Sequence, residues 1–245
     1  MKIGAQLYTV HDFTKTLDDL AETLKKVADI GYTTVQVSGT CAYEGDWLAE
    51  QLKKTGLSCV ITHSDPAKIA SETEAVIAKH DLFDCNGIGI GYYSMDKYDE
   101  FVTLFKPAAK LISASGKFLS YHNHDSEFRR APDGKLYLQK LVEDFDKDEL
   151  KFTLDTYWVQ AGGGDPIWWI NYLKGRVPCI HFKDMGYGKA MMPVGEGNMN
   201  FDGIIKACHD TGIEYALVEQ DNCNGEDPFD CLARSYRYLK AQGLS

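Results

Sequence analysis

The chain has 245 residues, of which 44% are apolar and 25% charged, a balance typical of a globular protein with a sizeable core. The formal net charge of −10 repels phosphate backbones and anionic lipids, so we expect neither a nucleic acid nor a membrane as a partner. No stretch approaches the roughly 18 consecutive apolar residues of a membrane-spanning helix, and the first residues enter a strand pattern with no signal peptide ahead of it.

The first half of the chain alternates β-branched runs with amphipathic segments. After the first run, Leu20, Leu24 and Val27 recur at helical spacing until Gly31 ends the pattern. Pro66 opens a later helix, as a proline in the first turn can. The elements predicted in chain order are a strand over 3–10, a helix over 16–31, a strand over 34–39, a helix over 46–54, a strand over 58–63, a helix from 66, a strand over 87–92 and a helix over 95–115.

The second half continues the alternation. One of its helices begins with Asp165 as a plausible N-cap and Pro166 at the first helical position. The predicted elements are a strand over 117–124, a helix over 136–145, a strand over 151–157, a helix from 165, a strand over 177–184, a helix over 200–209, a strand over 215–221 and a helix over 228–241.

Eight strand–helix units in strict alternation indicate a parallel sheet, because the connections between parallel strands are helical. Eight units within 245 residues suit a closed (β/α)₈ barrel, which typically needs about 250 residues. An open doubly wound sheet is the competing fold, but it often carries a G-x-G-x-x-G after its first strand, and none is present there. We therefore expect residues 1–245 to form a single barrel domain.

The last four predicted strands end in YHNH, LDTY, IHFKD and VEQD. Functional residues of such a barrel lie at the C-terminal ends of its strands, and alternate residues face opposite sides. We expect His122, Asp155, His181 and Glu219 to surround one divalent metal there. Two imidazoles and two carboxylates suit Mn²⁺, Zn²⁺, Co²⁺ or Fe²⁺ better than Ca²⁺, which prefers oxygen ligands alone.

Each of these residues also has a simpler interpretation. A histidine at a strand end is often a hydrogen-bonded core residue, and Asp155 could cap the turn that follows it. Glu219 could form an ion pair with Lys183. The occurrence of all four at matching ends of consecutive strands favours the metal site.

The sequence resembles the sugar phosphate isomerase/epimerase superfamily of xylose isomerase-like TIM barrels along almost its whole length. The similarity runs through MKIGAQLYTV, GYTTVQVSG, YHNH, LDTYWVQAGGGDP, IHFKDM, PVGEGNMNF and ALVEQD, and the segment DTYWVQAGGGDP followed by HFKD is most similar to the inosose dehydratase-like branch. The resemblance implies metal ligands at Asp155, His181 and Glu219. His122 stands where the family often has a glutamate, and Trp158 where many epimerases have a histidine.

The resemblance implies a metal-dependent isomerase or epimerase that acts on a sugar, keto-sugar or cyclitol. Glu219 would remove a proton next to a carbonyl to give a metal-stabilised enediolate, with Mn²⁺ favoured and Mg²⁺ a further alternative. Lys183 and His124 are further catalytic candidates. Because only one of the family's two glutamates is kept, a lyase that dehydrates or deglycosylates by β-elimination is the alternative. The candidate substrate-binding residues are Trp158, Tyr8, His63 and Glu196.

Two other functional classes remain open on the sequence. An AP endonuclease belongs to the same superfamily, but the net charge of −10 argues against DNA as a substrate. A non-catalytic sugar-binding protein would fit a decayed site, and a homo-oligomer is also open. The seven cysteines are scattered with no C-x-x-C pair, which indicates reduced thiols and a cytoplasmic protein.

Overall fold

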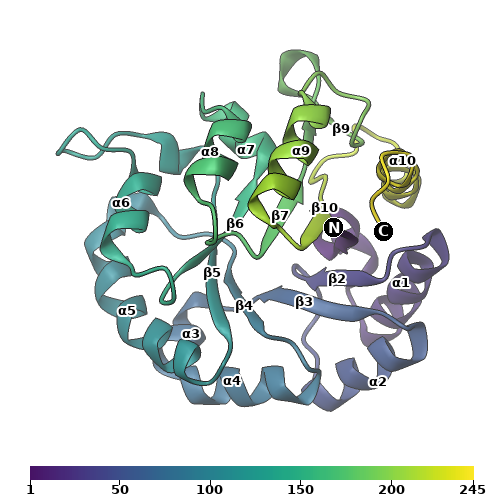
Figure 1. The fold of residues 1–245 in the computed structure, drawn as a ribbon. Coiled ribbons are helices and arrows are strands. Elements are labelled where there is room, and N and C mark those ends of the chain that lie inside the picture. Colours follow the sequence, from purple (N-terminus) through teal and green to yellow (C-terminus); the bar gives the residue numbers. More distant parts are fainter.

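Eight parallel strands close into a barrel in the computed structural model, which describes residues 1–245 (Figure 1). Neighbouring strands follow the order β1-β10-β7-β6-β5-β4-β3-β2, and β1 closes the ring by pairing with both β10 and β2. The predicted (β/α)₈ barrel is therefore confirmed. The barrel strands are β1 (Lys2–Gln6), β2 (Thr34–Val37), β3 (Ser58–His63), β4 (Gly87–Ile90), β5 (Phe118–His122), β6 (Lys151–Asp155), β7 (Cys179–Phe182) and β10 (Tyr215–Val218).

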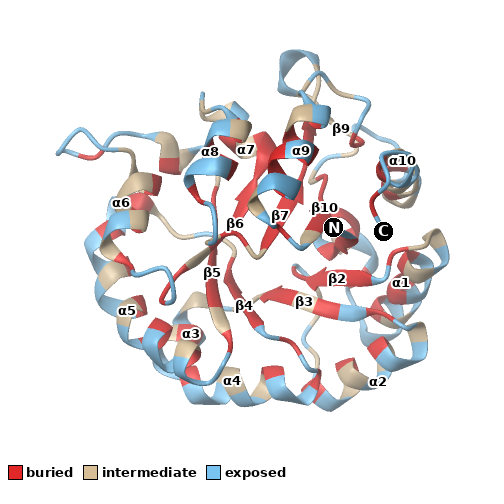
Figure 2. Cartoon of the chain, in the orientation of Figure 1, coloured by how far each residue is buried: buried red, intermediate tan, exposed pale blue.

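Helices surround the barrel, with their inner faces buried against the strands and their outer faces exposed (Figure 2). None of them combines the length and the apolar character needed to cross a bilayer. The helices are α1 (Leu17–Ile30), α2 (Gly45–Thr55), α3 (Pro66–Ser71), α4 (Thr73–Leu82), α5 (Tyr98–Ala114), α6 (Tyr137–Asp144), α7 (Thr156–Ala161), α8 (Pro166–Tyr172), α9 (Phe201–Thr211) and α10 (Pro228–Ala241).

The first helix shows why the local sequence predicts these elements well. Thr16 and Asp19 form a capping box at its start, and Gly31 ends it in a left-handed conformation with φ of 119°. Between them Leu20, Leu24 and Val27 are buried against the barrel. Capping and periodicity therefore specify the same helix, and similar signals define α8 and α10.

Most of the barrel strands end a few residues earlier at the mouth than predicted, and β1 and β6 show the reason. The strand predicted over 3–10 ends at Gln6, whose side-chain oxygen accepts a hydrogen bond from the Tyr8 amide and starts a 3₁₀ helix, η1 (Leu7–Phe13). The strand predicted over 151–157 ends at Asp155, which caps α7 through the Trp158 amide. In both places a polar side chain turns the backbone at the mouth and ends the ladder early.

The strand predicted over 177–184 is also divided. β7 ends at Phe182, and Asp184 belongs to β8 (Asp184–Met185), which forms a small antiparallel hairpin with β9 (Met191–Met192). The Asp184 carboxylate accepts hydrogen bonds from the backbone amides of Met185, Gly195, Gly197 and Met199. This buried carboxylate fixes the long segment between β7 and α9.

Candidate active site

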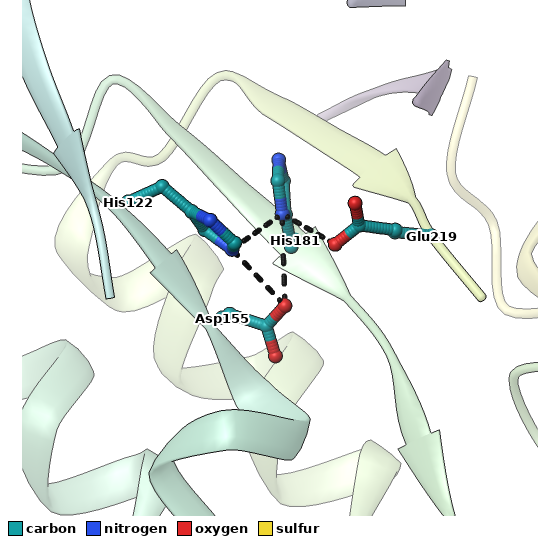
Figure 3. Close-up of side chains that lie close together, drawn as sticks. All are labelled: His122, Asp155, His181 and Glu219. Atoms are coloured by element: carbon teal, nitrogen blue, oxygen red, sulfur yellow. Dashed lines mark hydrogen bonds and ion pairs between the residues drawn. The ribbon is translucent and has the colours of Figure 1, made fainter. Parts of the chain in front are cut away.

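Four side chains converge at the C-terminal ends of neighbouring strands, as Figure 3 shows. His122 ends β5, Asp155 ends β6, His181 lies in β7, and Glu219 directly follows β10. One potential ligand atom from each lies within 4.8 Å of all the others, and all four residues are buried. We call these residues the four-residue cluster.

Strand register explains the convergence. Asp155 lies directly opposite His181 in the β6–β7 ladder, so their side chains lie on the same face at the same level. The Glu219 amide donates to the Phe182 carbonyl, which extends the β10–β7 contact by one residue beyond the strand. The parallel arrangement therefore brings residues from four separate parts of the chain to one mouth of the barrel.

Hydrogen bonds on the outer side of the cluster orient both imidazoles. His122 Nδ1 lies 3.1 Å from the Gly91 carbonyl, and His181 Nε2 lies 2.6 Å from Gln36 Oε1. When His122 Nδ1 and His181 Nε2 donate these hydrogen bonds, the other ring nitrogens, His122 Nε2 and His181 Nδ1, carry lone pairs that point into the cluster. These two inner nitrogens are 3.1 Å apart.

The carboxylates complete an all-acceptor centre. Asp155 Oδ2 lies 3.3 Å from His122 Nε2 and 3.6 Å from His181 Nδ1, and Glu219 Oε2 lies 3.0 Å from His181 Nδ1. Four acceptors this close repel one another unless a cation lies between them. In the metal-free protein the Lys183 ammonium and the raised pKa of His181, about 9, offset this repulsion. The donor set of two nitrogens and two oxygens also fits a divalent transition metal.

The pKa values follow from this charge arrangement. Burial opposes the charged form of His181, but Glu219 and Asp155 outweigh it and raise the pKa of His181 to about 9. Burial likewise opposes ionisation of Asp155, yet Lys183, His122 and His181 lower its pKa to about 2. The pKa of Glu219 is held well below its usual range by Lys183 and His181 despite burial. The cluster therefore holds two carboxylates that stay ionised at neutral pH.

Metal binding is expected to release about one proton at pH 7 to 8, because His181 must give up its Nδ1 proton to become a ligand. Apparent affinity should rise about tenfold per pH unit and level off above pH 9, where metal-free His181 is already neutral. Calorimetric titration with Mn²⁺ in buffers of different ionisation enthalpy measures the proton count. An affinity that does not change between pH 6.5 and 9 would contradict this protonation state.

Lys183 lies beside the cluster and balances its negative charge. Its Nζ is 2.6 Å from Asp221, 3.3 Å from Glu219 and 3.7 Å from Asp155. The ion pair between Glu219 and Lys183, which the sequence offered as an alternative to a metal site, therefore exists alongside the convergence of the four residues. Asp155 also combines two roles, since Oδ1 caps α7 while Oδ2 faces the two histidines.

A cavity of about 410 Å³ opens above the cluster, within the size range of small-molecule sites. His63, His124, Trp158 and Tyr8 line it, as do Lys183 and Glu219. Trp158 Nε1 and His124 Nδ1 are buried without a hydrogen-bond partner, and the Lys183 ammonium lies 5.1 Å from the Trp158 ring centre. Trp158 and His124 line the cavity, and each has a buried polar atom that lacks the hydrogen bond a ligand could supply.

Glu196, expected to contact substrate, is placed elsewhere. Its carboxylate pairs with Arg234 of α10 at 3.0 Å, and it is not among the residues that line the cavity. The Asp184 carboxylate holds the neighbouring amides of Gly195 and Gly197, so this segment packs toward α10. A substrate contact by Glu196 therefore stays a prediction, and in this structure its partner lies on a helix distant in sequence.

Several residues of the site carried no clear signal in the sequence. Gln6 Nε2 donates to Glu219 Oε1 at 2.9 Å, and Gln36 holds His181 as described. Asp221, which pairs with Lys183, also lines the cavity. A glutamine within an apolar strand is the one feature that marks Gln6 and Gln36, because a buried amide needs partners.

The fold and the site together define a (β/α)₈ barrel with a candidate metal centre at its mouth. The family model of the xylose isomerase-like TIM barrel matches residues 81–241, more than half of the chain, so the protein belongs to this family. No match was found among curated proteins.

Solved structures of the same architecture cover nearly the whole chain. A sugar phosphate isomerase/epimerase from Parabacteroides distasonis has 22% identity and a TM-score of 0.84, over 98% of this chain and 93% of that one. An L-ribulose 3-epimerase has 15% identity and a TM-score of 0.77, over 98% and 94%. A probable 3-DHS dehydratase from Bacillus anthracis has 18% identity and a TM-score of 0.73, over 98% and 99%. At these identities the similarity shows the fold.

Proposed function

We propose that the protein is a metal-dependent enzyme that removes a proton next to the carbonyl of a sugar, keto-sugar or cyclitol, with isomerisation or epimerisation as the outcome. The observation that carries the proposal is the convergence of four acceptor atoms within 4.8 Å at the base of a cavity of about 410 Å³. Fold relatives described as sugar isomerases or epimerases support the substrate class.

The four-residue cluster would hold one divalent cation, and we propose Mn²⁺ because imidazole and carboxylate ligands together suit it. When bound, the cation supplies Lewis-acid polarisation of a sugar carbonyl and a neighbouring hydroxyl. Gln6 and Gln36 hold Glu219 and His181 from outside, so two of the ligands are already oriented.

The chain's own groups supply the proton transfer. Glu219 is the proposed base, since its carboxylate is ionised, lines the cavity and is held in position by Gln6. Lys183 would donate a hydrogen bond to the oxygen on which negative charge develops, and Asp221 holds its ammonium in place. His124 is a further proton-transfer candidate; burial lowers the pKa of His124 to about 3, so its neutral imidazole would accept a proton. The Trp158 ring offers an apolar surface to a sugar ring.

A lyase is the second candidate, and the distribution of carboxylates in the cavity favours it. Only Glu219 and Asp221 contribute carboxylates to the lining, and both follow β10, whereas His63 and His124 come from other strand ends. A second carboxylate base that could return a proton from another side is thus absent from the lining. In the lyase reaction Glu219 would take the α-proton, the α,β double bond would form as the bond from the β-carbon to its oxygen breaks, and the Lys183 ammonium would protonate the departing oxygen.

Incubation with Mn²⁺ and a panel of ketoses and inososes in D₂O tests the proposal. Solvent deuterium should enter the carbon next to the carbonyl, and loss of water or of a substituent would identify the lyase. Glu219→Gln is expected to lower exchange by about 10²-fold or more, because it removes the base and weakens the metal site. Glu22→Gln on the exposed face of α1 is the control. Full exchange in Glu219→Gln would refute the assignment of the base.

A further inference from the structure

A second cavity of about 500 Å³ adjoins the cavity above the cluster. It lies beyond the C-terminal ends of β2 and β3, where the segment after β2 faces α3 and α4. The two cavities share Ser38, His63 and Ser64. These three residues form the boundary of both cavities, so a ligand long enough to pass them would occupy both.

The shared wall contains a group that lacks a partner. His63 Nδ1 is 3.0 Å from Ser38 Oγ, but His63 Nε2 is buried with no hydrogen-bond partner. The His63 ring centre lies 5.3 Å from that of His122, so the imidazole stands between the cluster and the second cavity. A buried nitrogen left free beside two cavities is available to a ligand that crosses between them.

The lining of the second cavity indicates the chemistry of its occupant. Tyr43, Ala75 and Val76 provide apolar surface, and Ser38 and Thr40 provide hydroxyl groups. Its two lysines, Lys68 and Lys79, are matched by two carboxylates, Asp65 and Glu72, so the lining has no net charge. Apolar faces with hydroxyl groups at the edge suit an uncharged ring that itself carries hydroxyl groups.

We propose that the substrate has two rings: the reacting sugar at the four-residue cluster, and a second hydroxylated, uncharged ring, a sugar or a phenol, in the cavity between β2, β3, α3 and α4. The assignment of the reacting ring to the four-residue cluster rests on the proposed function. It adds that recognition extends beyond one monosaccharide and that His63 lies at the junction of the two rings.

Cys41 lines the second cavity and serves as a reporter that is independent of catalysis. Alkylation of the native protein by iodoacetamide is followed by mass spectrometry in the presence of phenyl glycosides, disaccharides and methyl glycosides of the common hexoses. A two-ring compound at about ten times its Kd should slow alkylation of Cys41 about tenfold. Cys223, which is similarly half-buried but outside the cavity, is the internal control.

The outcomes distinguish the two kinds of second ring. Protection by disaccharides assigns a second sugar, and protection by phenyl glycosides assigns a phenolic ring. Methyl glycosides should leave Cys41 unprotected. If no two-ring compound protects Cys41, if methyl glycosides protect it as well, or if Cys223 slows equally, the inference is overturned.

Ala75→Trp provides a second test, because this exposed residue of α4 lines the cavity and a larger side chain would fill it. The variant should lose about tenfold in affinity for the protecting compound but keep deuterium exchange with a simple ketose. Ala78→Trp, exposed on the same helix but outside the lining, should retain both. Unchanged affinity in Ala75→Trp contradicts the second-ring site. Protection of Cys41 without deuterium exchange in any ketose contradicts only the proposed function.

Discussion

Asp155→Asn is expected to reduce bound metal from about one equivalent to nearly none and to lower kcat/KM about 10³-fold or more. The substitution removes the negative charge that faces His122 and His181 at 3.3 and 3.6 Å. Asparagine keeps an oxygen that can accept the Trp158 amide, so the cap of α7 is preserved and the loss reports on the metal site. Metal content after purification without chelator and initial rates with Mn²⁺ measure the two effects.

Asp165→Asn is the matched control. Asp165 caps α8 through the amides of Ile167 and Trp168 but lies outside the cavity. This variant should bind metal and turn over as the unmodified protein does. Native metal affinity in Asp155→Asn would contradict the role of Asp155 as a ligand.

Lys183→Met is expected to destabilise the metal-free protein by about 3–5 kcal/mol, because it removes the ammonium that pairs with the buried carboxylates of Asp155 and Glu219 and with the half-buried carboxylate of Asp221. Saturating Mn²⁺ should recover much of this stability, since the metal supplies the missing positive charge. Turnover should stay about 10²-fold lower or more, because the metal does not replace the donated hydrogen bond. Urea unfolding with and without Mn²⁺, together with initial rates, separates the two roles.

Lys189→Met is the control for this substitution. Lys189 lies in the segment between β8 and β9 and does not line the cavity. Its loss should change neither the effect of Mn²⁺ on stability nor turnover. If Lys183→Met kept full activity, Lys183 would be a structural counter-ion alone.

The barrel and the positions of the cluster residues were predictable because both depend on local, periodic signals. Alternation of strands and helices fixes the topology, and parallel strands place their C-terminal ends at one mouth. His122, Asp155, His181 and Glu219 each stand at such an end, so the sequence was sufficient to predict that they meet. Whether they bind a metal stays a prediction.

The parts that were missed depend on contacts between distant segments. Gln6 and Gln36 support the cluster from β1 and β2, and nothing near them in sequence indicates those partners. The position of Glu196 outside the cavity lining depends on Arg234, which pairs with it from α10. The early ends of β1 and β6 depend on whether Gln6 and Asp155 hydrogen-bond to backbone amides beyond the strand, which a periodic pattern does not encode.

Anomalous diffraction at the manganese edge, from crystals grown with Mn²⁺ and no chelator, tests the metal centre most directly. A single strong peak is predicted about 2.2 Å from His122 Nε2, His181 Nδ1 and one carboxylate oxygen each of Asp155 and Glu219. A map with no peak at saturating Mn²⁺, or with its peak bound by other residues, would contradict the proposed metal site and the chemistry built on it.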